Sequence, residues 1–109
     1  MWVAPSAEGA AKALDLSSRV EGRGEYDFAF DVKRDATESG AYPLILVSYH
    51  IVCLQYDSQD TVDLVKGFMT YVGSQEGQQA AADAAGSAPI SDDLRAQLID
   101  AINQISVGS

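Results

Sequence analysis

The second half of the chain has the hydrophobic period of amphipathic helices. Apolar positions recur every three or four residues, and polar or charged side chains lie between them. This pattern predicts helices near residues 59–72, 75–85 and 92–105, and the middle one is an alanine-rich run. The apolar stripe of the first helix consists of Val62, Val65, Phe68, Met69 and Val72. That of the last consists of Leu94, Leu98, Ala101, Ile102 and Ile105.

The residues that flank these helices are suited to begin or end them. Ser58 or Asp57, Ser74 and Ser91 each precede a predicted helix, and their side-chain oxygens can accept hydrogen bonds from free backbone N–H groups. Gly86 follows the alanine-rich run, where a glycine commonly ends a helix. The sequence therefore predicts three consecutive helices joined by short links.

The first 41 residues are less regular. Ala7–Leu14 is a short predicted helix that Ser6 can cap, and Arg19–Glu25 contains two glycines between charges and is typical of a loop. In Tyr26–Lys33 apolar and polar residues alternate, which predicts a half-buried strand. Asp35–Ala41 is small and polar, so we interpret it as a connection.

A long apolar segment, Tyr42–Leu54, separates this region from the helices. It is rich in Leu, Ile and Val with little alternation, which is typical of a strand buried on both faces of a sheet. Pro43 fits at the first residues of such a strand, where a missing N–H is tolerated. We expect a central strand over Leu44–Cys53 and therefore an α/β fold, with a long central strand followed by three helices.

Composition limits the classes of partner. The 109 residues are 47% hydrophobic, enough for one compact domain or a large piece of a bigger one. A formal net charge of -9 disfavours nucleic acid and anionic membranes as partners. The apolar segment is too short to span a bilayer as a helix. Met1–Pro5 lacks the features of a secretory signal, so the signal of an exported parent protein is expected upstream.

The chemically reactive side chains do not form a catalytic or metal-binding set. One cysteine and one histidine provide no internal disulfide and no zinc-ligand cluster. The cysteine content therefore does not indicate whether the protein resides in an oxidising or a reducing compartment. We expect Cys53 to be a packed thiol and His50 a partly buried, hydrogen-bonded side chain. Asp92 and Asp93 are expected to favour the positive end of a helix dipole. The sequence therefore indicates neither an enzyme nor a cofactor.

Several segments resemble a known family. Tyr42–Tyr49, followed by the helix at Thr61–Phe68, resembles the last crossover strand and helix of the PstS family, the phosphate-binding proteins of phosphate ABC transporters. Ser74–Gln79 and Ala85–Ile90 are similar to the "EGQ" helix start and the Ala-Pro link of that family. Trp2–Ser6 is similar to the segment that precedes an earlier helix in that family. These segments follow the family order over nearly the whole chain.

The resemblance implies a fold and a role. It implies that the chain is the C-terminal portion of a two-lobed periplasmic-binding-protein fold of type II. Residues 1–41 would be a remnant of the second lobe, and residues 42–109 the hinge strand and the helices that return to the first lobe. Such proteins hold inorganic phosphate between the lobes and deliver it to an ABC permease. The implied location is extracytoplasmic, in the periplasm or as a membrane-anchored lipoprotein.

The main phosphate-binding motifs of that family are absent, so the ligand-binding residues are unknown. The family uses a Thr/Ser-rich turn and an Arg-x-x-x-Ser-Gly-Thr motif. Arg34–Ala41 comes nearest to the second motif, but it has one residue too many between Arg and Ser and an alanine in place of threonine. We interpret this match as coincidence, because a guanidinium and backbone N–H groups must converge on one small anion. The isolated chain is therefore expected to bind phosphate poorly.

An alternative function is a small acidic α/β module that binds a protein partner through its helices. Sequence directly upstream that contained the missing phosphate motifs would favour the transporter protein, and unrelated sequence would favour the module. If the chain is a fragment of the two-lobed protein, unpaired strand edges and uncovered side chains such as Phe68, Met69 and Ile102 predict a homo-oligomer, formed by edge pairing or by exchange of residues 1–40.

Overall fold

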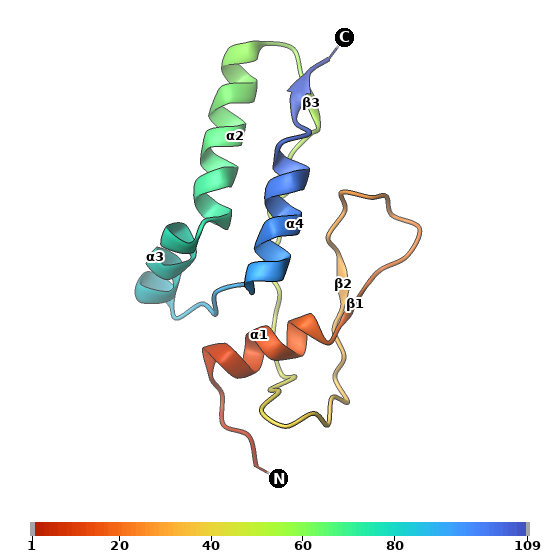
Figure 1. Ribbon diagram of the computed structural model, residues 1–109, viewed down its shortest axis with the longest axis vertical. Coiled ribbons are helices and arrows are strands. Elements are labelled where there is room, and N and C mark those ends of the chain that lie inside the picture. Colours follow the sequence, from red (N-terminus) through yellow and green to blue (C-terminus); the bar gives the residue numbers. More distant parts are fainter. Residues whose placement is uncertain (1, 109) are drawn as a thin grey trace.

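The computed structural model describes residues 2–108, where helices dominate and the strands are only two residues long (Figure 1). The elements in chain order are α1 (Ala7–Asp15), β1 (Ser18–Arg19), β2 (Phe30–Asp31), β3 (Gln55–Tyr56), α2 (Gln59–Gly73), α3 (Gln75–Ala85), α4 (Asp92–Ile102) and β4 (Ser106–Val107). The structure is therefore α/β, as expected, but helices and irregular connections make up most of it.

Each helix begins after a serine whose Oγ accepts a hydrogen bond from the backbone N–H three residues further on. These caps are Ser6, Ser58, Ser74 and Ser91, so Ser58 rather than Asp57 caps α2. Gly86 ends α3 in the left-handed conformation with a φ of 71°. The predicted serine caps and the predicted glycine at the end of α3 are therefore confirmed.

The last helix ends earlier than the apolar stripe predicted. The α4 helix stops at Ile102, because the N–H groups of Gln104 and Ile105 bond to carbonyls only three residues back and so tighten the final turn. Ile105 nevertheless remains buried, and from there the chain enters β4. The hydrophobic pattern therefore identified a core residue and assigned it to the wrong element.

The main core lies between α2 and α4, which run side by side in Figure 1. Val62, Ile102 and Ile105 are its buried members, and β3 pairs in parallel with β4 at one end of it. The partly buried residues packed against them are Tyr56, Val65, Met69 and Ile99. Phe68 was expected on this face but is 60% exposed, because it lies toward the side of α2 that carries the exposed residues Leu64 and Tyr71.

The predicted strand at Tyr26–Lys33 is confined to β2. Its partner is β1, with which it is antiparallel, and Arg19 lies opposite Phe30. Before β2 the backbone turns locally, since the N–H of Asp27 bonds to the carbonyl of Gly24 and the Asp27 carboxylate accepts a bond from the N–H of Ala29. These local hydrogen bonds compete with strand pairing and shorten the strand.

Residues 42–54, which we call the extended segment, run as a trace between the N-terminal region and β3 (Figure 1). Within residues 2–108 they pair with no strand, and Leu46 and Ile51 are 95% and 94% exposed. The prediction of a central strand buried on both faces is therefore wrong for the described residues. Burial of a strand requires neighbouring strands and covering layers, and the rest of this chain provides only two-residue pairings.

The molecule is less compact than a single domain of its length. Its radius of gyration is 15.4 Å and its dimensions are 53 × 34 × 18 Å. A compact domain of this many residues has a radius of gyration of about 13 Å. The difference reflects the exposed extended segment and the loop between β1 and β2.

Candidate functional site

The connection after β2 contains Arg34, the arginine of the incomplete phosphate motif. Its Nη1 donates hydrogen bonds to the carbonyl oxygens of Pro43 at 3.0 Å and Ile45 at 2.7 Å. The guanidinium therefore holds the start of the extended segment, a role that the sequence did not reveal.

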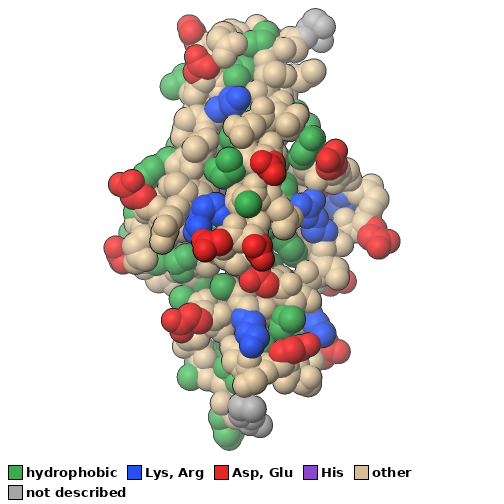
Figure 2. All heavy atoms as spheres, in the orientation of Figure 1, with side chains coloured by type: hydrophobic (Ala, Val, Ile, Leu, Met, Phe, Trp, Pro, Cys, Tyr) green, Lys and Arg blue, Asp and Glu red, His purple; other side chains and the backbone are tan. Residues whose placement is uncertain are grey.

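Other cations near this connection are also bound to protein oxygens. The Lys12 ammonium donates to the carbonyl of Ser39, and Lys33 Nζ lies 3.2 Å from Glu38 Oε1. The backbone N–H of Glu38 itself, followed by the Lys33 ammonium, lowers the pKa of the Glu38 carboxyl below its ordinary 4.5. Figure 2 shows basic side chains interspersed with acidic ones on this face of the molecule. These contacts support the interpretation of Arg34–Ala41 as a chance motif match.

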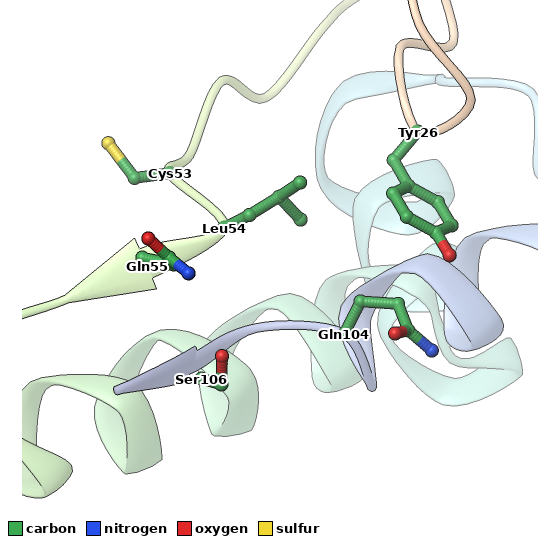
Figure 3. Close-up of a pocket in the computed structure, with 6 residues that line it drawn as sticks. All are labelled: Tyr26, Cys53, Leu54, Gln55, Gln104 and Ser106. Carbon is green, nitrogen blue, oxygen red and sulfur yellow. The ribbon is translucent and has the colours of Figure 1, made fainter. Parts of the chain in front are cut away.

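A surface hollow with a volume of about 580 Å³ lies beside β3 and β4 (Figure 3). The residues that line it are Tyr26, Cys53, Leu54, Gln55, Gln104 and Ser106. None of these side chains is positively charged at neutral pH, so the hollow offers only neutral hydrogen-bonding groups to a ligand. A phosphate needs charged or convergent donors to replace its hydration, and this hollow does not supply them. The sequence did not predict it, since neutral amides and hydroxyls carry no distinctive spacing.

The side chains of His50 and Cys53 lie differently from the sequence prediction. Both are exposed, whereas a partly buried histidine and a packed thiol were expected. The reason is the exposure of the whole extended segment, which carries both residues. His50 makes an edge-to-face contact with Phe68, with ring centroids 6.2 Å apart, in a second hollow of about 360 Å³ between the segment and α2.

Asp92 and Asp93 lie in the first turn of α4, where the helix dipole favours negative charge, as predicted. Asp92 also pairs with Arg95, whose Nε donates to the carbonyl of Gly73 at 3.1 Å. Among residues 2–108 no three His, Cys, Asp or Glu side chains are close enough together to hold a metal ion. In the same range no helix is long and apolar enough to cross a membrane.

Comparison with known proteins identifies two similar sequences. The chain is 33% identical over 108 residues to the phosphate-binding protein PstS2 of Mycobacterium bovis (strain BCG / Pasteur 1173P2), and equally to the phosphate-binding protein PstS 2 of Mycobacterium tuberculosis (strain ATCC 25618 / H37Rv). Each alignment covers 95% of this chain and 28% of the relative. No family model and no solved structure matches the chain.

These comparisons confirm the resemblance to the PstS phosphate-binding proteins. The similarity extends over nearly the whole chain, yet the chain spans only 28% of the length of the relatives. The alignment is consistent with a C-terminal PstS-like part, and the α/β structure is compatible with a piece of such a protein.

Proposed function

We propose that this chain is the C-terminal portion of the phosphate-binding component of a phosphate ABC transporter. The observation that carries this proposal is the 33% identity over 108 residues with two phosphate-binding proteins. In this role the protein binds and releases inorganic phosphate by hinge bending between two lobes, without catalysis. Its further partner is an ABC permease, and its location is extracytoplasmic, in the periplasm or as a lipoprotein.

A boundary near residues 41 and 42 supports the two-lobe assignment. The α2–α4 core belongs entirely to residues 42–109, whereas residues 1–41 have their own buried residues, Ala13 and Ala41. The contacts between the two parts are hydrogen bonds, among them those from Arg34 to the carbonyls of Pro43 and Ile45 and that from Arg19 to Gln97 at 2.8 Å. We therefore assign residues 1–41 to the second lobe and residues 42–109 to the hinge strand and the first lobe.

The phosphate ligands of the complete protein are proposed to lie mainly outside these 109 residues. The hollow beside β3 and β4 has no cationic lining, and Arg34 is bonded to two backbone carbonyls. In this proposal the chain contributes structural parts of the two lobes, and the rest of the protein contributes most of the phosphate ligands.

Titration calorimetry of the isolated chain with inorganic phosphate tests this placement of the ligands. We expect no saturable binding at micromolar phosphate, because too few donors replace the hydration of the anion. An Arg34→Gln variant is a useful control, since its heats should match those of the wild type. Saturable micromolar binding that Arg34→Gln abolishes would show that the site lies in this chain.

The alternative function, a protein-interaction module, is favoured by the exposed apolar side chains of the extended segment. The coding sequence upstream of Met1 separates the two functions. A Thr/Ser-rich turn and an Arg-x-x-x-Ser-Gly-Thr motif there would support the transporter protein, whereas unrelated upstream sequence would support the module.

A further inference from the structure

Arg34 is bonded across the boundary between the two proposed lobes. Its Nη1 donates to the carbonyls of both Pro43 and Ile45. The chain turns between these two carbonyls, since the N–H of Ile45 bonds to the carbonyl of Pro43 at 3.0 Å, and the turn brings both within reach of one donor. Hydrogen bonds from a charged donor are about twice as strong as neutral ones. One side chain of the second-lobe part therefore fixes the first turn of the extended segment.

Helix α1 contacts the same turn. The N–H of Tyr42 donates to the carbonyl of Gly9 in α1 at 2.9 Å, and Ala41, directly before Tyr42, is buried. All of these contacts join residues of this chain, so they do not depend on any further chain that covers the faces of the extended segment. Residues 42–45 are thus held by α1 and by Arg34 together.

Further along the extended segment the contacts change from the second-lobe part to the first-lobe part. The Tyr49 hydroxyl still accepts a hydrogen bond from the N–H of Phe30 in β2 at 3.0 Å. The next residue, His50, lies against Phe68 of α2, and beyond it β3 pairs with β4. Contacts with the first-lobe part therefore begin at His50 and not at the start of the extended segment.

We propose that residues 42–45 form one rigid body with residues 1–41, that Arg34 is the positioning residue that holds them there, and that the lobes bend beyond Ile45. Hinge bending requires a few residues between two bodies that absorb the change in backbone dihedral angles. The residues between Ile45 and His50 lie between the last contact of Arg34 and the first contact of α2. The bending of lobes rests on the proposed function, whereas the rigid body is tested without phosphate, so either can fail alone.

Hydrogen exchange of single amides in the 109-residue chain, followed by nuclear magnetic resonance, tests the role of Arg34. Arg34→Gln should make the N–H groups of Tyr42 and Ile45 exchange about tenfold faster and leave the amides of α2 and α4 unchanged. A merely structural role would speed up all amides alike. Lys33→Gln is the matched control, since it removes the neighbouring positive charge and only an exposed ion pair with Glu38. Equal exchange in the two variants, or uniform acceleration throughout the chain in Arg34→Gln, would overturn the proposal.

A pair of helix-cap variants tests which body contains residues 42–45. Ser6 caps α1 and Ser58 caps α2, and replacing either serine by alanine should speed up exchange in its own helix about fivefold. We expect Ser6→Ala to speed up the amides of Tyr42 and Ile45 together with those of α1, and Ser58→Ala to leave them unchanged. If Ser58→Ala speeds them up as much as Ser6→Ala, or if they stay unchanged while α1 exchanges faster, the proposal is overturned.

Discussion

Gly9 is the residue at which α1 touches the connection before the extended segment. A Cβ atom built on Gly9 would lie 3.1 Å from the carbonyl oxygen of Gly40 and 3.1 Å from Cβ of Tyr42. The carbonyl of Gly9 also accepts a hydrogen bond from the N–H of Tyr42 at 2.9 Å. The sequence suggested only that this glycine weakens a helix, whereas the structure shows that it permits a close approach of two backbones.

Replacing glycines at two helical positions separates the effect of helix propensity from that of the close backbone approach. Gly67→Ala, in α2, has open space around the added methyl group and should stabilise the protein by about 0.5–1 kcal/mol through helix propensity. Gly9→Ala gains the same propensity but crowds Gly40 and Tyr42, and should destabilise by about 1 kcal/mol or more. Urea unfolding measures both. Equal stabilisation by the two substitutions would show that α1 does not pack against the connection.

At the scale of elements, side chains from α3 and α4 cap the end of α2. The last carbonyls of a helix lack partners within it. Gln78 Nε2 donates to the carbonyl of Val72 at 2.7 Å, and Arg95 Nε donates to that of Gly73. Gln78 Oε1 also accepts a bond from the N–H of Ile90, so one side chain ties α2 to the link before α4.

A comparison of two adjacent glutamines tests this arrangement. Gln78→Ala removes both bonds of a partly buried amide and should cost about 1–3 kcal/mol of the free energy of unfolding. Gln79→Ala removes one exposed bond to Asp83 within α3 and should cost about 0.5 kcal/mol or less. Thermal or urea unfolding gives both values. Similar losses in the two variants would contradict the capping role of Gln78.

The elements differ in how well the sequence predicted them. The helices were predicted closely because their signals are local: a serine cap such as Ser58, a period of apolar positions, and a glycine at the end such as Gly86. The burial of the extended segment was predicted wrongly. Its hydrophobic residues indicate that other parts of a protein should cover it, but they do not indicate which parts. His50 and Cys53 were misplaced for the same reason. The hollow beside β3 and β4 was missed because it is formed by residues distant in sequence.

At the scale of the whole molecule, the open shape and the apolar surface have one explanation. The extended segment has the composition of a buried strand, yet the described residues leave it exposed and unpaired. In the proposed transporter protein, further chain would cover both its edges and its faces. The backbone groups of this segment need hydrogen-bond partners, and that chain would supply them.

The most direct test of the proposed function is a hybrid protein. The part of Mycobacterium tuberculosis PstS 2 that aligns with this chain, 28% of its length, would be replaced by the present sequence. Calorimetry would then compare phosphate binding by the hybrid and by the intact relative. We expect the hybrid to unfold cooperatively and to retain saturable phosphate binding, because the chain supplies the framework and the remainder supplies the phosphate ligands. A folded hybrid without phosphate binding, or one that cannot fold, would contradict the assignment of this chain to a phosphate-binding protein.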